Sequence, residues 1–400
     1  MTRSKKPVKP RAIVFLGAGA SQFVGYRTFQ SFDDLFFDAH VREVEQLPPV
    51  RDSTLQLMRE LRSSLEYQSK PVTHDNYLWL LNQYRQFCST LSKGDSIRTR
   101  IGPQADALCS AISPFDRDIG TAADDITTTT IHHYSHNRVA LLKTGDSNAA
   151  KKLLEVRDFY VALARYNNAT HPYLPVFTTN YDMLLEDMWQ DPDIGFGGIP
   201  YVNGITGVTS EQGVWNATTY AKYQCTGIHY YRLHGCACWL YHVYGNETIF
   251  YHRQDILEKE PGSLCAMFPG REIFRGKNPH ARAFHALYDS MVSCEFIIFV
   301  GFSFRDDDVM HLLLAANASR QGRRLKLVVV NPGMNPGRVK AELQEASTRS
   351  QFPVAIPHSD DIIHFEQRFG WELTSADEII NKARKIMKNE IVNKAKEKRT

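Results

Sequence analysis

The residues of this sequence that could do chemistry stand directly after short apolar runs. A glycine-rich stretch, Gly17-Ala18-Gly19-Ala20-Ser21, follows the apolar residues 12–16. An apolar run that breaks into glycines is typical of a buried parallel strand followed by a phosphate-binding loop. Four further polar clusters follow later runs in the same way: Thr179-Asn180-Tyr181-Asp182, His234-Gly235, Gly301-Phe302-Ser303 and Asn331.

The glycine loop predicts a contact between backbone and phosphate. Gly17 and Gly19 lack a Cβ, so a pyrophosphate could approach the main chain closely and the turn could adopt positive φ. A helix expected to begin near Ser21 would direct its free N–H groups at that anion. The same small turn also closes many strand–helix units that bind nothing, so the loop alone leaves both interpretations open.

Two of the later residues have side chains suited to catalysis. His234 could take up a proton near neutral pH. Asn180 could orient a hydroxyl group or a water without competing for that proton. Each also has a structural interpretation, in which His234 is held in a turn and Asn180 caps the next helix. Ser303 and Asn331 could likewise be helix caps.

The elements that must position these clusters are the strands before them. The apolar runs alternate with helical patterns, which is typical of a parallel sheet covered on both faces; they lie at residues 12–16, 174–178, 230–233, 296–300 and 325–330. Ligands of such sheets bind beyond the carboxyl ends of the strands. Because all five clusters stand at that end, together they favour a nucleotide site.

We expect an α/β fold in which a Rossmann-like parallel sheet carries a large all-helical insertion. Residues 31–170 predict the insertion, because they read mostly as helices, at 54–65, 75–91, 104–112 and 149–165. The sheet domain then comprises residues 1–30 and 171–375. Residues 376–400 are predicted to form a basic C-terminal helix.

Composition places the chain among ordinary globular proteins. Its 400 residues are 43% hydrophobic and 23% charged, and no apolar run is long enough to span a membrane. The apolar run behind the basic N-terminus ends in the glycine loop, so it predicts a strand and not a signal peptide. Seven irregularly spaced cysteines argue against a disulfide framework, and we expect a cytoplasmic protein with reduced thiols.

The net charge of +3 is unevenly distributed. Residues 1–11 carry five basic and no acidic side chains, and residues 382–400 carry eight basic side chains and two acids, so the body between them is net negative. Basic ends can touch nucleic acid or an acidic partner, but solvated tails are the simpler interpretation. Direct binding of nucleic acid is therefore not expected.

Two more clusters could bind a metal ion. His132, His133 and His136 have helical spacing, but no suitably spaced carboxylate accompanies them and a polar helix face explains them as well. The acids Asp306–Asp308 look like a magnesium site. Since acids favour helix N-termini, we expect them instead to open the helix after Ser303.

As an ordered set, the polar clusters resemble those of sirtuins. The quoted residues are Gly17–Ser21, Thr179–Asp182, Leu233-His234-Gly235 and Gly301–Ser303. The longer stretch Gly301-Phe302-Ser303-Phe304-Arg305-Asp306-Asp307-Asp308 is more similar to the sirtuin-like domains of prokaryotic antiphage defence proteins. The resemblance covers residues 12–30 and about 171–335, and it implies that NAD is the substrate.

The resemblance assigns roles to single residues. Gly17, Ala18, Gly19 and Ser21 would hold the NAD pyrophosphate. Gly301, Ser303 and Asn331 would also bind NAD, the last two at the adenosine ribose. Asn180 would orient a water or the nicotinamide ribose, Asp182 would brace that loop, and His234 would be the general base. Cleavage of the nicotinamide–ribose bond passes through an oxocarbenium-like state, as glycoside cleavage does, and nicotinamide leaves without a strong acid.

One departure from the family bears on the reaction. Sirtuin deacylases carry a zinc ribbon with two Cys-x-x-Cys pairs after the His-Gly, whereas this chain has Cys236, Cys238 and then a lone Cys265. That spacing does not fit structural zinc, so no zinc is expected and hydrolysis of NAD is favoured over deacylation.

The resemblance therefore implies an NAD hydrolase that forms nicotinamide and ADP-ribose and acts in abortive antiphage defence by depleting NAD. The alternatives are an NAD-dependent protein deacylase and a non-catalytic sensor of NAD or ADP-ribose that gates a partner. Within this family we expect a homo-oligomer that works with a separate ATPase of the HerA type. No association with a membrane is expected.

Overall fold

The computed structural model describes a large part of the chain. The residues that it describes are 9–24, 33–44, 46–67, 122, 125–126, 128–130, 132–134, 147–206, 212–222, 226–242, 247–251, 264–266, 278–320, 325–349, 356–367, 369 and 375–385. Among them, no helix is both long and apolar enough to cross a membrane.

A seven-stranded parallel sheet forms the centre of the structure, which confirms the predicted α/β architecture. Its strands lie in the order β12 (Ile362–Phe365), β11 (Lys326–Val330), β10 (Phe296–Val300), β1 (Ala12–Leu16), β2 (Tyr173–Thr178), β6 (Gly227–Arg232) and β3 (Tyr201–Val202). The strand order reverses beside β1, where β2 lies on one side and β10 on the other. Ligands of open parallel sheets bind at such a point.

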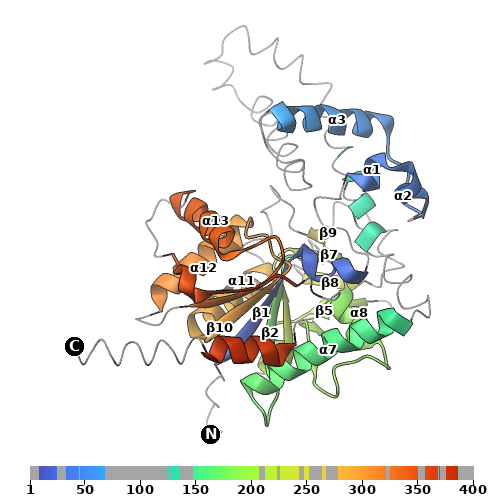
Figure 1. Cartoon of the computed structure of the whole chain (residues 1–400). Helices are drawn as coiled ribbons and strands as arrows, with labels where there is room; N and C mark the ends of the chain where they lie inside the picture. Colours follow the sequence, from blue (N-terminus) through green and yellow to red (C-terminus); the bar gives the residue numbers. More distant parts are fainter. Residues whose placement is uncertain are drawn as a thin grey trace, which may run out of the picture.

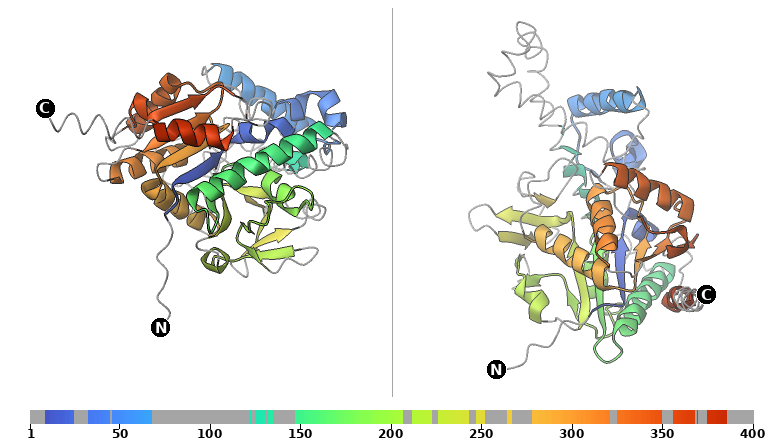
Figure 2. Two further views of the ribbon diagram at one scale, coloured as in Figure 1. Left: turned by 60° about the horizontal axis from the view of Figure 1, so that its bottom comes forward. Right: turned by 90° about the vertical axis from the view of Figure 1, so that its left-hand side faces the viewer.

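Helices cover both faces of this sheet (Figures 1 and 2). On one face lie α7 (Ser147–Asn167) and a helix at residues 376–385. On the other lie α11 (His280–Ser293), α12 (Asp307–Ser319) and α13 (Pro336–Arg349). The fully apolar strands are explained by this arrangement, because a strand with helices on both sides exposes neither row of its side chains.

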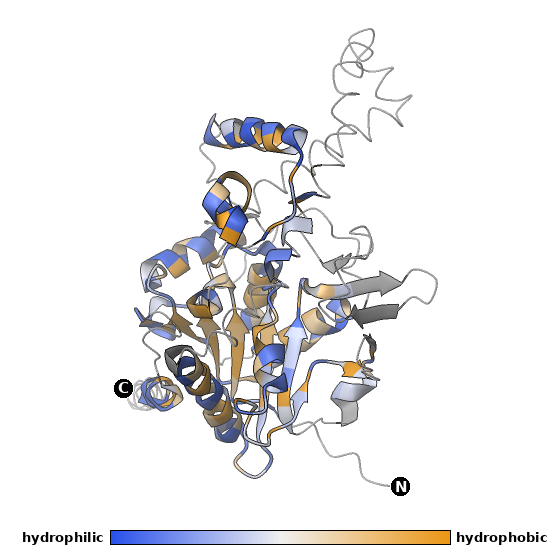
Figure 3. Ribbon diagram, turned by 90° about the vertical axis from the view of Figure 1, so that its right-hand side faces the viewer, coloured by the Kyte–Doolittle hydropathy of each residue, from blue (hydrophilic) through white to orange (hydrophobic). Residues whose placement is uncertain are grey.

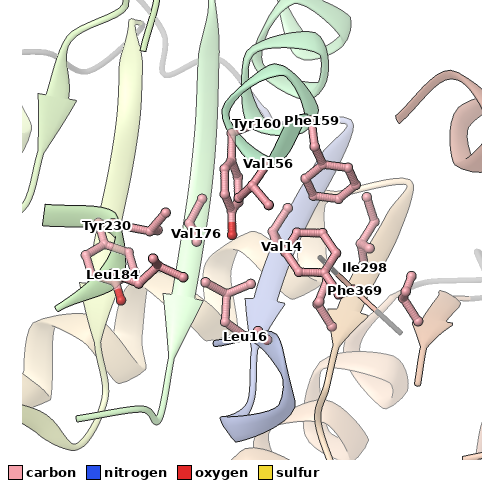
Figure 4. Close-up of a cluster of buried hydrophobic side chains, with 14 of the residues drawn as sticks. Val14, Leu16, Val156, Phe159, Tyr160, Val176, Leu184, Tyr230, Ile298 and Phe369 are labelled. Carbon is pink, nitrogen blue, oxygen red and sulfur yellow. The ribbon is translucent and has the colours of Figure 1, made fainter. Parts of the chain in front are cut away.

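Alternate residues of β1 supply the two halves of the core. Val14 and Leu16 pack in the cluster beneath α7, while Ile13 and Phe15 pack beneath α11 and α12. Figure 4 shows the first cluster, in which Val156, Phe159 and Tyr160 of α7 lie against Val14, Leu16 and Val176 of the sheet. Figure 3 shows apolar residues concentrated on the strands and polar residues on the outer sides of the helices.

A second sheet lies beside the first and was not predicted. It is antiparallel, with the order β4 (Ile205–Thr206), β5 (Gln212–Trp215), β8 (Glu247–Tyr251), β7 (Gly235–His242) and β9 (Leu264–Ala266). Because β7 begins at Gly235, this sheet continues directly from His234.

The predicted helical insertion is described in part. Its first helices are α1 (Asp34–Phe37), α2 (Ala39–Val44) and α3 (Asp52–Tyr67), and α3 confirms the predicted helix at 54–65. The predicted helices at 75–91 and 104–112 lie outside the described residues. Helix α7 lies before the predicted boundary at residue 170, yet it packs on β1, β2 and β6 of the sheet. Figure 1 shows α1–α3 at one end of the molecule, away from α7.

The basic C-terminal segment is helical where it is described, from 376 to 385. Ala376, Ile379, Ile380 and Ala383 are buried in the same core as α7. The solvated tail was expected for residues 382–400, and of the described residues in that range only Ala383 is buried. The remaining basic residues, 386–400, lie outside the described part of the chain.

Candidate active site

The carboxyl ends of five parallel strands form one row. Leu16 pairs with Val300 on one side and with Thr178 on the other. Thr178 pairs in turn with Arg232, and Val300 with Val330. Every polar cluster predicted from the sequence begins within two residues of this row. The sheet therefore brings the clusters together at one edge, as the strand pattern predicted.

The glycine loop packs against the loop that follows β10. Gly17 donates its N–H to Val300 O (2.9 Å), and Gly19 donates to Gly301 O (3.1 Å). A Cβ on Gly17 would lie 2.6 Å from Gly301 O, and a Cβ on Gly301 would lie 2.3 Å from Ala20 N. Glycine is required at both places because the two main chains are in contact.

Two expectations about this loop are wrong. Positive φ occurs at Gly301 (+59°), whereas Gly17 has φ −103°. No α-helix begins at Ser21, because the chain forms two 3₁₀ turns there, η1 (Ala18–Ala20) and η2 (Gln22–Val24). Turns this short do not supply the dipole of a helix N-terminus.

Most backbone N–H groups of the glycine loop already donate a hydrogen bond to another backbone carbonyl. Ala20 donates its N–H to Gly17 O (2.9 Å), and Ser21 donates to Ala18 O (3.4 Å). The N–H of half-buried Ala18 donates to none of the described residues. A ligand that accepts hydrogen bonds can use this amide.

Asn180 is buried and its orientation is determined by its contacts. Its Nδ2 donates to Gly17 O (2.9 Å) and lies 3.4 Å from Ser21 Oγ. Only the amide nitrogen can donate to a carbonyl, so these contacts fix which end of the side chain is which. Its Oδ1 accepts no hydrogen bond from the described residues. Asn180 therefore offers an acceptor to a hydroxyl group or a water.

Asp182 is the next buried polar residue of the loop that carries Asn180. Its Oδ1 accepts a hydrogen bond from Leu184 N (3.1 Å), at the start of α8 (Leu184–Gln190). Burial raises the pKa of Asp182 above its usual value, although the charge of Arg232 and a hydrogen bond from Ser21 act against burial. Through Ser21, Asp182 connects the loop after β2 to the glycine loop.

A buried ion pair holds the main chain of the Asn180 loop. Arg232, the last residue of β6, donates from Nε and Nη2 to the carboxylate of Glu186 in α8 (2.9 and 2.7 Å). The same guanidinium donates from Nη1 to Asn180 O (3.0 Å) and from Nη2 to Asp182 O. The two side chains are 1% and 4% exposed. Sequence reasoning missed this pair, although a lone arginine at the end of a buried strand indicates a buried acid nearby.

His234 is paired with a carboxylate. Its Nε2 lies 3.1 Å from Asp306 Oδ2, and the two side chains are only 18% and 16% exposed. The ring of Tyr181 lies beside it, with centroids 6.4 Å apart. Tyr134, from the predicted insertion, lies in turn 6.1 Å from Tyr181. Tyr181 thus lies between His234 and a segment of the predicted insertion.

A second histidine supports the turn that carries the first. His280 Nδ1 donates to Leu233 O (2.8 Å), directly before His234. Burial lowers the pKa of His280 to about 4, against the effect of that hydrogen bond. His280 is therefore a neutral donor at physiological pH, which the sequence did not indicate.

Asp306 caps α12, so the prediction that an acid opens this helix is confirmed. Its Oδ1 accepts a hydrogen bond from Val309 N (3.1 Å). Burial alone would raise the pKa of Asp306. The positive charge and hydrogen bond of His234, with backbone N–H groups of the helix, lower that pKa below its usual value overall. Sequence reasoning found the cap but not the pairing with His234.

The remaining predicted residues lie in the loops after β10 and β11. Ser303 is exposed. Asn331 donates from Nδ2 to Phe302 O (3.0 Å) and accepts from Gly333 N (3.0 Å). Its side chain thus joins the two loops and caps its own turn. Contacts of Gly301, Ser303 and Asn331 with a nucleotide stay a prediction.

The cysteines near His234 are core residues. Cys236 and Cys238 are buried cysteines of β7 that form no disulfide with a described residue, and they pack with Met183 and Trp239. Burial raises the pKa of Cys236 well above its usual value. Within the described ranges, no group of three or more histidines, cysteines and acids could hold a metal ion.

Comparison with known proteins identifies one domain. Residues 175–350, less than half of the chain, match the family model of a SIR2-like domain. This part of the chain is sirtuin-like. It contains every candidate residue except those of the glycine loop. One solved structure, described as "Structural Basis for the Mechanism and Regulation of Sir2 Enzymes", has 12% sequence identity and a TM-score of 0.36 over 95% of this chain and 94% of that chain. No curated protein matches the sequence.

Proposed function

We propose that this chain is an NAD hydrolase, which uses water to cleave NAD into nicotinamide and ADP-ribose. The observation that carries the proposal is that one edge of the sheet carries both a fixed amide and a histidine bound to a carboxylate. Asn180 and His234 both follow the row of strand ends in a SIR2-like domain, and both are held by hydrogen bonds or ion pairs.

The residues fit a dinucleotide at this edge of the sheet. The N–H of Ala18, which has no acceptor among the described residues, is a donor for a phosphate oxygen. Asn180 Oδ1 is an acceptor for a ribose hydroxyl or for the attacking water. His234 takes the proton of that water while its oxygen bonds to the ribose carbon, the bond from that carbon to nicotinamide breaks, and the proton passes to solvent. NAD supplies a good leaving group, so the site needs no strong acid.

Hydrolysis is favoured over deacylation by the surroundings of the two cysteines after His234. Cys236 and Cys238 are one residue apart and are packed into a small core with Met183 and Trp239. They do not form the Cys-x-x-Cys pair that begins the zinc ribbon of sirtuin deacylases. The described strands that follow the His-Gly, β7, β8 and β9, belong to the antiparallel sheet.

The sequence resemblance extends the proposal to a biological role. We propose that the chain acts in the cytoplasm as a homo-oligomer and depletes NAD during abortive antiphage defence. A separate HerA-type ATPase would be its partner. Co-purification of the chain with the product of the neighbouring reading frame, followed by measurement of cellular NAD after phage infection, tests this role.

The activity is tested by incubating the purified chain, alone and with that ATPase, with NAD and measuring nicotinamide and ADP-ribose. We expect equal amounts of both products, and loss of both in His234→Ala and Asn180→Ala. His285→Ala is the matched control, because His285 is an exposed histidine on α11 that pairs with Asp289. Unchanged turnover in either site variant would disprove the mechanism. Release that requires an acylated peptide would indicate a deacylase, and binding of NAD without turnover would indicate a sensor.

A further inference from the structure

We propose that Asp306 is the positioning residue of the candidate base: it holds His234 so that the ring nitrogen facing away from Asp306 accepts the proton. This role rests on the proposed hydrolysis of NAD. It adds a function to a residue that the sequence assigned only to the start of a helix.

The carboxylate of Asp306 is held at both oxygens. Oδ1 accepts the N–H of Val309, and Oδ2 faces Nε2 of His234 at 3.1 Å. The first turn of α12 is itself anchored, because Val309 and Met310 are fully buried in the core beneath the helix. A carboxylate fixed to a rigid helix can fix the imidazole that it binds.

Three elements lie near His234 or hold its turn. Asp306 approaches from α12, and Tyr181 approaches from the loop after β2. His280 of α11 holds the carbonyl of Leu233, immediately before His234 in the chain. Each of these three elements brings a titratable side chain near the imidazole or its turn. Of the three, Asp306 is the one that carries a charge at neutral pH, since the pKa of His280 is about 4 and that of Asp306 lies below its usual value.

The pairing determines what the imidazole can do. A carboxylate accepts a hydrogen bond and does not donate one, so the nitrogen that faces Asp306 keeps its proton. The other nitrogen then carries the lone pair. When that nitrogen takes a proton from water, the imidazolium stands beside a carboxylate that stabilises it. Asp306 itself neither gains nor loses a proton.

The main test is Asp306→Asn, with Asp307→Asn as the matched control. Asparagine caps helices as well as aspartate does, so the start of α12 is kept while the charge is lost. Asp307 is an exposed acid in the same helical turn. We expect nicotinamide release by Asp306→Asn to fall by about 100-fold or more in kcat. The acid limb of its pH profile should move to lower pH by about one unit, and Asp307→Asn should match wild type.

A second readout does not depend on turnover. With ¹⁵N-labelled histidine, NMR of the chain without NAD reports the tautomer and the protonation of His234, whose signals are identified by their loss in His234→Ala. In wild type we expect a single tautomer, with the proton on the nitrogen facing Asp306. In Asp306→Asn we expect a mixture of tautomers and protonation at lower pH. Asp306→Ser, which also caps a helix, should behave in the same way.

The outcomes separate this role from the proposed function. If His234 has the same spectrum and the same titration in wild type and in both Asp306 variants, the positioning role is refuted. A change in kcat without a change in the shape of the pH profile or in the tautomer would mean that Asp306 is only a helix cap, which also refutes it. If the NMR signals change as expected while no variant and no wild-type sample cleaves NAD, the positioning role holds and the hydrolase proposal fails.

Discussion

Removing Arg232 should loosen the loop that carries Asn180. The guanidinium makes two hydrogen bonds to Glu186 and one each to the carbonyls of Asn180 and Asp182. Arg232→Met fills a similar volume but supplies none of these donors. It leaves the carboxylate of Glu186, which is 4% exposed, without its counter-charge.

The size of the effect follows from this burial. Removing one partner of a buried ion pair costs about 3–5 kcal/mol, because the other charge is left without a partner in the protein interior. That is a large share of a total stability of about 5–15 kcal/mol. At roughly 2 °C per kcal/mol for a chain of this size, Arg232→Met should lower Tm by on the order of 6–10 °C.

Activity should fall beyond this loss of stability, because the Asn180 carbonyl loses its donor. Lys326→Met is the matched control. Lys326 forms the other fully buried ion pair within the described residues, with Asp361, but it lies at the amino end of β11, away from the site. It should lower Tm by about as much as Arg232→Met does. Measured well below both Tm values, only Arg232→Met should reduce kcat for nicotinamide release.

The double variant Glu186→Leu/Arg232→Met separates charge from position. Replacing both members of a buried pair by apolar residues is often neutral or stabilising. The double variant should therefore lose less Tm than the losses of Glu186→Leu and Arg232→Met added together. Its kcat should stay low, since the Asn180 loop still lacks its anchors. The reasoning is refuted if Arg232→Met keeps both the Tm and the kcat of wild type, or if the double variant recovers full activity.

Two further predictions concern the supports of the site. Gly301→Ala places a Cβ 2.3 Å from Ala20 N on a residue with φ +59°. It should therefore lower both Tm and the affinity for NAD measured by calorimetry. Gly333→Ala is the control: its Cβ would meet nothing closer than 3.6 Å, so it should change neither quantity. The pKa of His280 is about 4 in the folded chain and about 6.5 in the unfolded chain. Its contribution to the free energy of unfolding, on the order of 3 kcal/mol, is therefore complete above pH 6.5 and is lost as the pH falls toward 4. Urea unfolding at a series of pH values measures this effect, and in His280→Gln the free energy of unfolding should fall less between pH 6.5 and 4. An unchanged pH dependence would contradict the role of His280 as a buried neutral donor.

The sequence predicts the sheet, and the edge at which the candidate site residues gather, well for a physical reason. A strand covered on both faces has to be apolar throughout, and a turn at its end has to be polar or contain glycine. Runs such as 12–16 and 296–300 therefore predict both the strands β1 and β10 and the place where their clusters meet. The antiparallel sheet could not be predicted in this way. Its β4 and β9 have two and three residues, too few to show a period.

The pairs that hold the site also escape sequence reasoning, because each joins elements far apart in the chain. Arg232 lies 46 residues from Glu186, and only the fold shows that β6 ends beside α8. Asp306 has the signature of a helix cap, and nothing in the sequence distinguishes it from Asp307 or Asp308. Its pairing with His234 depends on where α12 begins relative to the end of β6.

The glycine loop shows how the fold changes the interpretation of a motif. From the sequence, Gly17 and Gly19 were predicted to let a phosphate approach the main chain. In the fold, the space that their Cβ atoms would fill is occupied by the loop at Gly301. That contact places the carbonyl of Gly17 where Asn180 Nδ2 binds it, while Ser21 reaches Asp182. A shift of the glycine loop would therefore also turn the Asn180 amide. The loop proposed to bind phosphate and the loop proposed to orient the water form one hydrogen-bonded unit, so a ligand that orders the first also orders the second.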